Sequence, residues 1–198
     1  EDLFEGGEVF SSLKKVVLGK DVEKIGDAAF MANLNVEFEI SEDNPYLTYE
    51  NGLLKSKDNK VVYMATSEFE GAFIGSEELE CLSMGAFIGS KVTKVVLPES
   101  VKYIPHYAFA LCNNLTSVSF PGATSFGMLV VYYCSKLDTV ELPVNIPLIP
   151  VEDEENIEIA MYAFASTASE GVTLKIIGSG AAPYYSFADY MNVVMGDG

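Results

Sequence analysis

Apart from carboxylates, side chains that could carry chemistry are scarce in this chain. Its 198 residues include a single histidine, His106, three cysteines, and 29 Asp and Glu. A general base at His106 would need a nucleophile and an orienting carboxylate, and the surrounding sequence offers neither at a fixed spacing. One histidine also excludes a His-rich zinc site. We therefore predict no catalytic residue, no metal site and no cofactor.

The three cysteines, Cys81, Cys112 and Cys134, are too few for a disulfide scaffold in a chain of this length. None belongs to a C-x-x-C pair, and the odd count leaves at least one thiol free or paired between chains. We expect all three to be small buried apolar residues, as free cysteines usually are. A bridge between Cys112 and Cys134, which occupy equivalent positions in successive copies of the repeat described below, is the open alternative.

The charge balance is strongly acidic. There are 29 Asp and Glu against 12 Lys, with no Arg, and the formal net charge is −17. Phosphates would repel such a chain, which has no guanidinium group to grip them, so we expect no nucleic acid partner. Residues 1–99 carry −10 (9 Lys, 19 acids) and residues 100–198 carry −7 (3 Lys, 10 acids). This spread favours a solubilising surface over a dedicated cation site.

Length and composition are those of a folded domain with a buried core. Apolar residues make up 49% and charged residues 21% of the chain. No run of 18 or more apolar residues is present, so we expect no membrane span. The chain begins at Glu1 rather than Met, which favours a processed secreted protein or a segment expressed without its export signal.

A repeat with a period of about 22 residues dominates the sequence, and periods of this size are typical of solenoids. One copy reads V-x-x-I-x-x-x-A-F-x-x-C-x-x-L-x-x-V-x-F-P over residues 101–121, and its pattern recurs over residues 123–143. Related copies span residues 13–30 and, with one deletion, residues 79–98. Residues 146–164 fit a further copy that is lengthened by an 11-residue insertion. Five copies with matching spacing indicate an internal repeat rather than chance.

Such a repeat predicts a solenoid, because each unit is too short to bury its own apolar side and must stack on its neighbours. The L-x-x-V-x-L-P part of a copy predicts a short strand that ends at the proline. The I-G-x-x-A-F part predicts a tight turn. We therefore expect a β-rich solenoid with short strands, tight turns and few helical turns.

These motifs resemble the BspA-like class of leucine-rich repeat, whose copies read roughly L-x-x-V-x-L-P-x-x-V-x-x-I-G-x-x-A-F-x-x-C. The resemblance covers about residues 10–180, although Pro105 and Pro150 replace the usual Gly, and Val130-Val131 replaces Ala-Phe. It implies a single leucine-rich-repeat domain over residues 1–198. It further implies a bacterial protein, secreted or attached to the cell surface, with a role in adhesion or in host and matrix interaction.

Between Phe30 and Leu79 the period fails and other patterns replace it. Apolar and acidic side chains alternate over residues 36–40, which predicts a half-buried strand. The segment 44–54 resembles a hairpin insertion that accompanies the family, and its Asn51-Gly52 pair is a strong hairpin signal.

The interruption as a whole predicts a β-hairpin insertion over about residues 41–70 that extends the sheet of the solenoid. We expect its strands near residues 47–49, 52–55 and 60–64. The hexapeptide Gly71–Ser76 recurs letter for letter as Gly85–Ser90. Because this offset is not the repeat period, we interpret the duplication as coincidence or local history.

Two regions near the C-terminus also depart from the period. The acidic insertion at about residues 151–159 could offer oxygen ligands to calcium, but it lacks the alternating spacing and the glycine of a preformed calcium loop. We favour a solvated surface bulge. The tail resembles the short terminal helix of the family, so we expect a helical cap over about residues 180–194, with its helix around 183–190. A cap is needed because an open solenoid end exposes core.

In the strand part of each copy, the positions between the apolar residues face outward. Stacking would align them into a ribbon that runs from basic through hydroxyl-rich to acidic side chains. Solenoids bind partners through extended faces of this kind, and a merely solvated sheet face is the alternative. The candidate binding residues are Lys14, Lys15 and Val17, then Thr93, Lys94 and Val96, then Thr116, Ser117 and Ser119, then Asp138, Thr139 and Glu141.

Three functions follow from these features. A non-catalytic protein that binds a protein, or another host or extracellular-matrix macromolecule, fits an extended face best. The alternative is a structural spacer that displays other parts of the same polypeptide. An enzyme is disfavoured, since His106 occupies a variable repeat position that holds Asp27, Met84 and Met128 in other copies.

Overall fold

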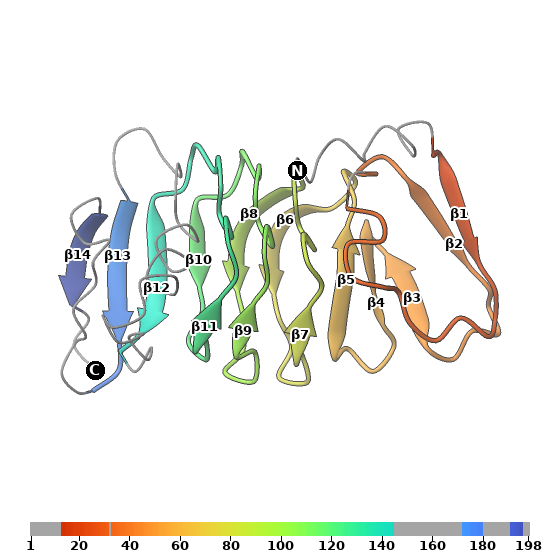
Figure 1. The fold of residues 1–198 in the computed structure, drawn as a ribbon, viewed down its shortest axis with the longest axis horizontal. Helices are drawn as coiled ribbons and strands as arrows, with labels where there is room; N and C mark the ends of the chain where they lie inside the picture. Colours follow the sequence, from red (N-terminus) through yellow and green to blue (C-terminus); the bar gives the residue numbers. More distant parts are fainter. Residues whose placement is uncertain (1–12, 32, 145–171, 180–190, 196–198) are drawn as a thin grey trace.

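The chain forms an elongated solenoid, which the computed structural model shows with the first strand near one end and the last strand at the other (Figure 1). The structure describes residues 13–31, 33–144 and 172–179 and the backbone of 191–195. Within these ranges the regular elements are all strands. This confirms the predicted β-rich solenoid.

One long parallel sheet runs along the solenoid, and its central strands are the predicted repeat strands of residues 91–96, 117–119 and 139–143. Thr139 pairs with Ser117, one repeat period apart. Ser117 pairs with Lys94, which is one residue further away than the period, so the extra residue is absorbed outside the strands. The six strands, in spatial order, are β14 (Met191–Met195), β13 (Val172–Ile177), β12 (Thr139–Pro143), β10 (Ser117–Ser119), β8 (Lys91–Val96) and β6 (Glu70–Ile74).

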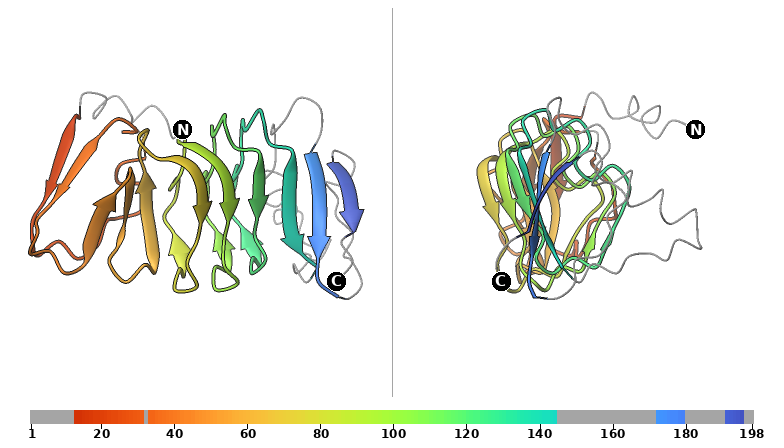
Figure 2. Two further views of the ribbon diagram at one scale, coloured as in Figure 1. Left: turned by 180° about the vertical axis from the view of Figure 1, so that it is seen from behind. Right: turned by 90° about the vertical axis from the view of Figure 1, so that its left-hand side faces the viewer.

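A second layer of very short strands lies across the coil from this sheet. It comprises β7 (Cys81–Leu82), β9 (Tyr103–Ile104) and β11 (Ser125–Phe126), and β9 pairs with β11 exactly one repeat period further on. The view along the long axis in Figure 2 shows successive coils superposed on one another. Stacked turns connect the layers, and the Phe87 and Phe109 amides donate to carbonyls one coil further on, those of Ala108 and Val130, at 2.8 Å each.

The core lies between the two layers and consists of the repeated apolar positions. The Phe87 and Phe109 rings stack with centroids 5.3 Å apart, and Phe109 stacks on Phe120 at 5.7 Å. Apart from the half-buried Phe126, the inward apolar side chains of the copies from 79 to 144 are almost completely buried. The two cysteines of this core, Cys112 and Cys134, are buried and unbridged.

At the N-terminal end, β1 (Lys15–Leu18) pairs in parallel with β2 (Glu37–Ile40). The strand expected over residues 36–40 is therefore present. Lys15 pairs with Glu37, one repeat period away, so the period does not fail directly after Phe30, as the sequence pattern had indicated. The register persists in the backbone because the alternating apolar residues of β2 occupy the same inward positions as those of β1.

The predicted hairpin insertion is present as β3 (Leu47–Glu50), β4 (Leu53–Ser56) and β5 (Val61–Ala65), which form antiparallel pairs. Asn51 and Gly52 both have positive φ, 52° and 77°, as the tight turn between β3 and β4 requires. β5 then pairs in parallel with β7, so the insertion extends the second layer of the solenoid.

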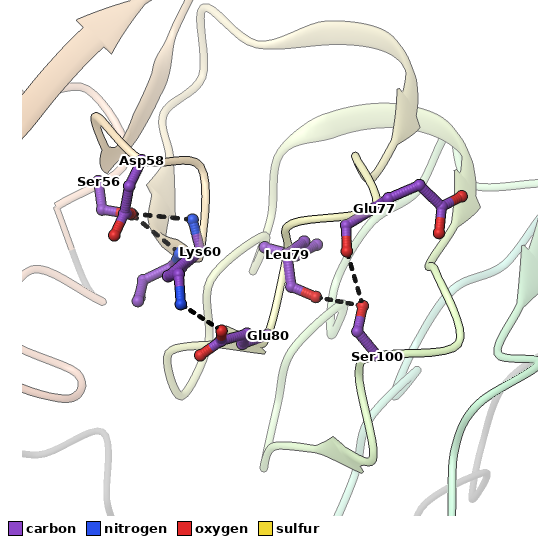
Figure 3. A network of polar contacts seen from close by, with 8 residues as sticks. Ser56, Asp58, Lys60, Glu77, Leu79, Glu80 and Ser100 are labelled. Carbon is purple, nitrogen blue, oxygen red and sulfur yellow. Dashed lines mark hydrogen bonds and ion pairs between the residues drawn. The ribbon is translucent and has the colours of Figure 1, made fainter.

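Polar contacts fasten this insertion to the solenoid (Figure 3). The Lys60 ammonium lies 2.5 Å from the Glu80 carboxylate, and the Glu80 amide donates to the Lys60 carbonyl at 2.8 Å. One coil further on, the Ser100 hydroxyl donates to the Leu79 carbonyl at 2.6 Å. These bonds satisfy polar groups at the point where the regular period is interrupted.

The helical cap is not supported. Residues 191–194, which fall in its expected range, belong to strand β14, whose pairing with β13 continues the parallel sheet. A parallel neighbour provides hydrogen-bond partners for the whole edge of β13, which explains why this segment is extended. The helix expected around residues 183–190 and the acidic insertion at 151–159 lie outside the described residues.

Candidate binding surfaces

The outward positions of β8, β10 and β12 form one surface, which we call the strand face. Register places Lys94, Ser117 and Thr139 in one row across the sheet, and Val96, Ser119 and Glu141 in the next. All of them are exposed or half-buried. The strand face comprises these six residues together with Thr93 of β8 and with Thr116 and Asp138, which directly precede β10 and β12.

Lys14, Lys15 and Val17 do not join this surface. They lie in or directly before the chain's first strand, β1, which pairs with β2 in a separate two-stranded sheet. The hairpin insertion lies between that sheet and the six-stranded sheet (Figure 1). Lys15 is also ion-paired, 2.6 Å from the Glu39 carboxylate and 3.7 Å from that of Glu37. The predicted ribbon is thus interrupted, and its basic end stands apart.

The acidic end of the strand face is tied into the sheet. The Glu141 carboxylate accepts a hydrogen bond from Ser119 at 2.9 Å and pairs with the Lys175 ammonium of β13 at 2.8 Å. Burial opposes ionisation of Glu141, but these hydrogen bonds and the charges of Lys175 and Lys94 prevail and lower its pKa. Glu141 therefore remains an anion with fixed orientation.

The strand face continues onto apolar residues toward β6. Ile74 pairs with Val96 across the β6–β8 register, and its side chain is 60% exposed. The face therefore has small hydroxyl side chains in its middle, one aliphatic border and one charged border. A surface of this kind suits a broad macromolecular contact rather than an enclosed small molecule.

A groove of about 510 Å³ opens on the opposite layer, and we call it the second-face groove. Strands β5, β7 and β9 supply one part of its lining, and the segment 24–27 supplies another. Tyr103 in this lining is 45% exposed. The lining residues are Lys24, Ile25, Asp27, Val61, Tyr63, Cys81, Leu82, Ser83, Met84, Tyr103, Pro105 and His106.

His106 connects two coils at the rim of this groove. Its Nδ1 accepts a hydrogen bond from the Met128 amide at 2.9 Å. This bond leaves Nε2 as the protonated nitrogen of the neutral ring. Nδ1 of His106 thus bonds to the neighbouring coil, and the Nε2–H group on the other side of the ring can donate a hydrogen bond.

The cysteines divide into two groups. Cys81 is exposed in the groove, so the expectation that all three are buried was wrong for it. β7 carries Cys81 at an outward position of the second layer, which the sequence pattern did not distinguish. The Cys112 and Cys134 thiols donate to the carbonyls of Phe87 and Phe109 at 2.9 and 3.0 Å. The Cys112 side chain and burial raise the pKa of Cys134 far above its ordinary value.

Within the described ranges, no group of three or more His, Cys, Asp or Glu side chains is placed to hold a metal ion. None of the described residues forms a helix long and apolar enough to cross a membrane. The calcium alternative concerns the acidic insertion at 151–159, which lies outside the described residues.

Comparison with known families agrees with the repeat geometry. Residues 80–153 match the model of the BspA type leucine rich repeat region, which spans 6 copies. The repeats within residues 80–153 are BspA-type leucine-rich repeats. The matched BspA-type segment contains the three central strands of the strand face, together with β7, β9 and β11. No curated protein sequence matches the chain.

Solved structures show the same fold. The pneumococcal vaccine antigen PcpA aligns with a TM-score of 0.57 and 17% identity, over 93% of this chain and 56% of that one. A leucine rich cell surface protein from Faecalibacterium prausnitzii A2-165 aligns with a TM-score of 0.55 and 15% identity, over 91% and 51%. The chain thus spans about half the length of these two structures.

Sequence reasoning found the strand face but missed the second-face groove. Its residues come from four segments of the chain, and the loop that contains Lys24 and Asp27 reaches the groove only through the fold. One signal was available: Tyr103, His106 and Cys81 are off-pattern residue types at outward repeat positions. Because packing fixes the inward positions of a repeat, unusual residue types at its outward positions indicate which coil carries a binding site.

Proposed function

We propose that this chain is a non-catalytic bacterial repeat protein, secreted or attached to the cell surface, that binds a host or extracellular-matrix macromolecule. The BspA-type repeats and the names of the similar structures, a pneumococcal vaccine antigen and a leucine rich cell surface protein, support this role. The partner is a protein or another matrix component, and adhesion is the outcome of binding.

The proposal rests on the strand face, whose outward side chains are aligned in rows by the register of the parallel strands. Rows of outward side chains on three neighbouring parallel strands hold donors, acceptors and charges at fixed spacings. Buried apolar positions beneath them make the backbone rigid, so little ordering entropy is lost when a partner docks. The exposed Ile74 at the border adds apolar surface that a partner could cover.

A matched pair of substitutions tests the strand face. Ser117→Arg places a bulky cation in the centre of the face, and Ser125→Arg makes the same change on β11 of the opposite layer. Both sites are strand positions that are open to solvent or half-buried, so both variants are expected to fold. Binding to immobilised collagen, fibronectin and laminin is then measured by surface plasmon resonance.

The proposal predicts that Ser117→Arg abolishes the binding that the wild-type chain shows, whereas Ser125→Arg retains it. Loss with Ser125→Arg alone would assign binding to the second layer. Equal binding by both variants and the wild type would show that the strand face is not the binding site. Thermal unfolding of each variant controls for loss of structure.

A structural spacer is the second candidate, because the chain spans only about half the length of the similar structures. A spacer would hold other parts of a longer polypeptide at a distance, and its own faces would be solvated. Absence of binding by the wild-type chain to every matrix macromolecule, together with lost adhesion when the segment is shortened in the intact protein, would favour this function.

A further inference from the structure

The second-face groove has the features of a ligand site that is distinct from the strand face. Its volume of about 510 Å³ falls in the range of small-molecule sites, roughly 300–1,000 Å³. It lies on the layer formed by β5, β7 and β9, across the core from β8 and β10. The sole histidine of the chain, its one exposed cysteine among the described residues, and two tyrosines line it together.

Charge narrows the choice of ligand. Lys24 and Asp27 are both exposed on the loop wall, where their opposite charges nearly cancel. An anionic ligand would approach against the net charge of −17. A cationic ligand would be attracted by that net charge, but within the groove Lys24 offsets the Asp27 carboxylate that would bind it. A neutral ligand is neither repelled by the net charge nor dependent on a single charged group in the groove.

Apolar surface in the groove comes from Tyr63 and Tyr103 together with Ile25 and Val61. Tyrosine rings present flat faces that C–H groups can cover, while their hydroxyls stay able to hydrogen-bond. Burial raises the pKa of Tyr63 and Tyr103, and the Asp27 carboxylate raises the pKa of Tyr103 further. Both hydroxyls therefore stay protonated at neutral and mildly alkaline pH.

The polar groups of the groove form a mixed set. The Asp27 carboxylate only accepts hydrogen bonds, and the Lys24 ammonium and the Nε2 of His106 donate. The tyrosine hydroxyls do both. A quaternary ammonium ion would use only the Asp27 carboxylate and the faces of the tyrosine rings, and a phosphate would use the donors alone. A ligand with many hydroxyls would use all of them, because each hydroxyl both donates and accepts.

We propose that the second-face groove binds a neutral saccharide, one face of which packs on Tyr103 while its hydroxyls bond to Asp27, Lys24 and His106. The site has one carboxylate among its lining residues, so the groove binds the sugar without the carboxylate pair that hydrolysis of a glycosidic bond uses. This site is independent of the partner proposed for the strand face.

Saturation-transfer NMR and calorimetric titration test the groove with defined probes. The neutral probes are lactose, maltose, cellobiose and N,N′-diacetylchitobiose, with a heparin disaccharide as the anion and tetramethylammonium as the cation. We expect at least one neutral disaccharide to bind and neither charged probe to compete with it. Tyr103→Ala should weaken that binding about tenfold, and Tyr103→Phe should weaken it less, because the ring face is kept.

Tyr46→Ala is the matched control, since Tyr46 is 42% exposed on the hairpin insertion and Tyr103 is 45% exposed. It should leave binding unchanged, as should Ser117→Arg on the strand face. Failure of all four neutral disaccharides to bind at millimolar concentration would overturn the proposal. Equal weakening by Tyr46→Ala and Tyr103→Ala, or tetramethylammonium binding that Tyr103→Ala abolishes, would also overturn it.

Discussion

Asn44 is buried completely, and its side chain makes four hydrogen bonds to the backbone. Its Nδ2 donates to the carbonyls of Gly19 and Val22 at 2.8 and 3.0 Å. Its Oδ1 accepts from the amides of Tyr46 and Leu47 at 2.8 Å each. One residue thus joins the loop after β1 to the start of the hairpin insertion.

Asn44→Ala should lower the free energy of unfolding by about 2–4 kcal/mol, because it leaves several buried backbone groups without partners. Urea unfolding followed by circular dichroism measures the change. Asn113→Ala, at an exposed asparagine, should stay within about 0.5 kcal/mol of the wild type. A similar loss in both variants would show that the bonds of Asn44 do not matter.

Thiol chemistry should distinguish Cys81 from the other two cysteines. Burial, Glu80 and Asp27 raise the pKa of Cys81, so its thiol reacts more slowly at neutral pH than an unstructured cysteine. Below that pKa the reactive thiolate fraction, and with it the alkylation rate, should rise about tenfold per pH unit.

Mass spectrometry after iodoacetamide treatment should find one label per native chain and none in Cys81→Ser. Cys112 and Cys134 should react only after denaturation, because both are buried among the coils. Rapid labelling of two sites in the native protein would contradict the assignment.

At the scale of elements, the repeated hexapeptide shows where sequence reasoning ends. Gly71–Ser76 begins within strand β6, which runs from Glu70 to Ile74, whereas the identical Gly85–Ser90 forms a turn with positive φ at Gly85 and Gly89. The Gly75 amide bonds to Val96 across the sheet. Its counterpart, Gly89, bonds to Ala110 in the next turn. The neighbouring coil, not local propensity, selects the conformation.

The same contrast explains which parts of the molecule could be predicted. Inward repeat positions can be recognised in the sequence because apolar residues recur there with the repeat period. The spacing therefore predicted the core, the strands β8, β10 and β12, and the strand face. The spacing did not predict the second-face groove, because the repeat period does not determine the position of the loop that brings Asp27 to the groove lined by Tyr103. The exposure of Cys81 was missed because the pattern did not show that Cys81 occupies the outward position of the two-residue strand β7.

Gly52 in the hairpin turn should resist substitution. Its φ is +77°, and a Cβ there would lie 2.3 Å from the backbone nitrogen of Phe69. Gly52→Ala should therefore destabilise the protein by about 2–4 kcal/mol, through both backbone strain and a clash with rigid main chain. Thermal and urea unfolding measure the loss.

Gly71 provides the control that separates the two causes. Its φ is +98°, and a Cβ there would meet nothing within 4 Å. Gly71→Ala should cost only the strain, about 1 kcal/mol. Comparable losses at the two positions would show that the contact with Phe69 contributes little.

For the whole molecule, the net charge of −17 predicts a salt effect on stability. Repulsion among carboxylates should weaken as the Debye length falls from about 30 Å at 0.01 M to about 3 Å at 1 M salt. The melting temperature should therefore rise with sodium chloride, although exposed pairs such as Lys15–Glu39 weaken. A fall in melting temperature over this range would mean that ion pairs outweigh repulsion.

The offset of one repeat period that separates β1 from β2, β9 from β11 and β10 from β12 also bears on how such a protein can change length over generations. Adding or deleting one whole repeat period lengthens or shortens the molecule by one strand spacing, about 4.8 Å, and leaves every inward position in place. The longer offset between Lys94 and Ser117 shows that a single extra residue is tolerated when it falls between strands. Unequal recombination within the gene can therefore adjust the reach of the protein in whole coils while each exposed row keeps its alignment.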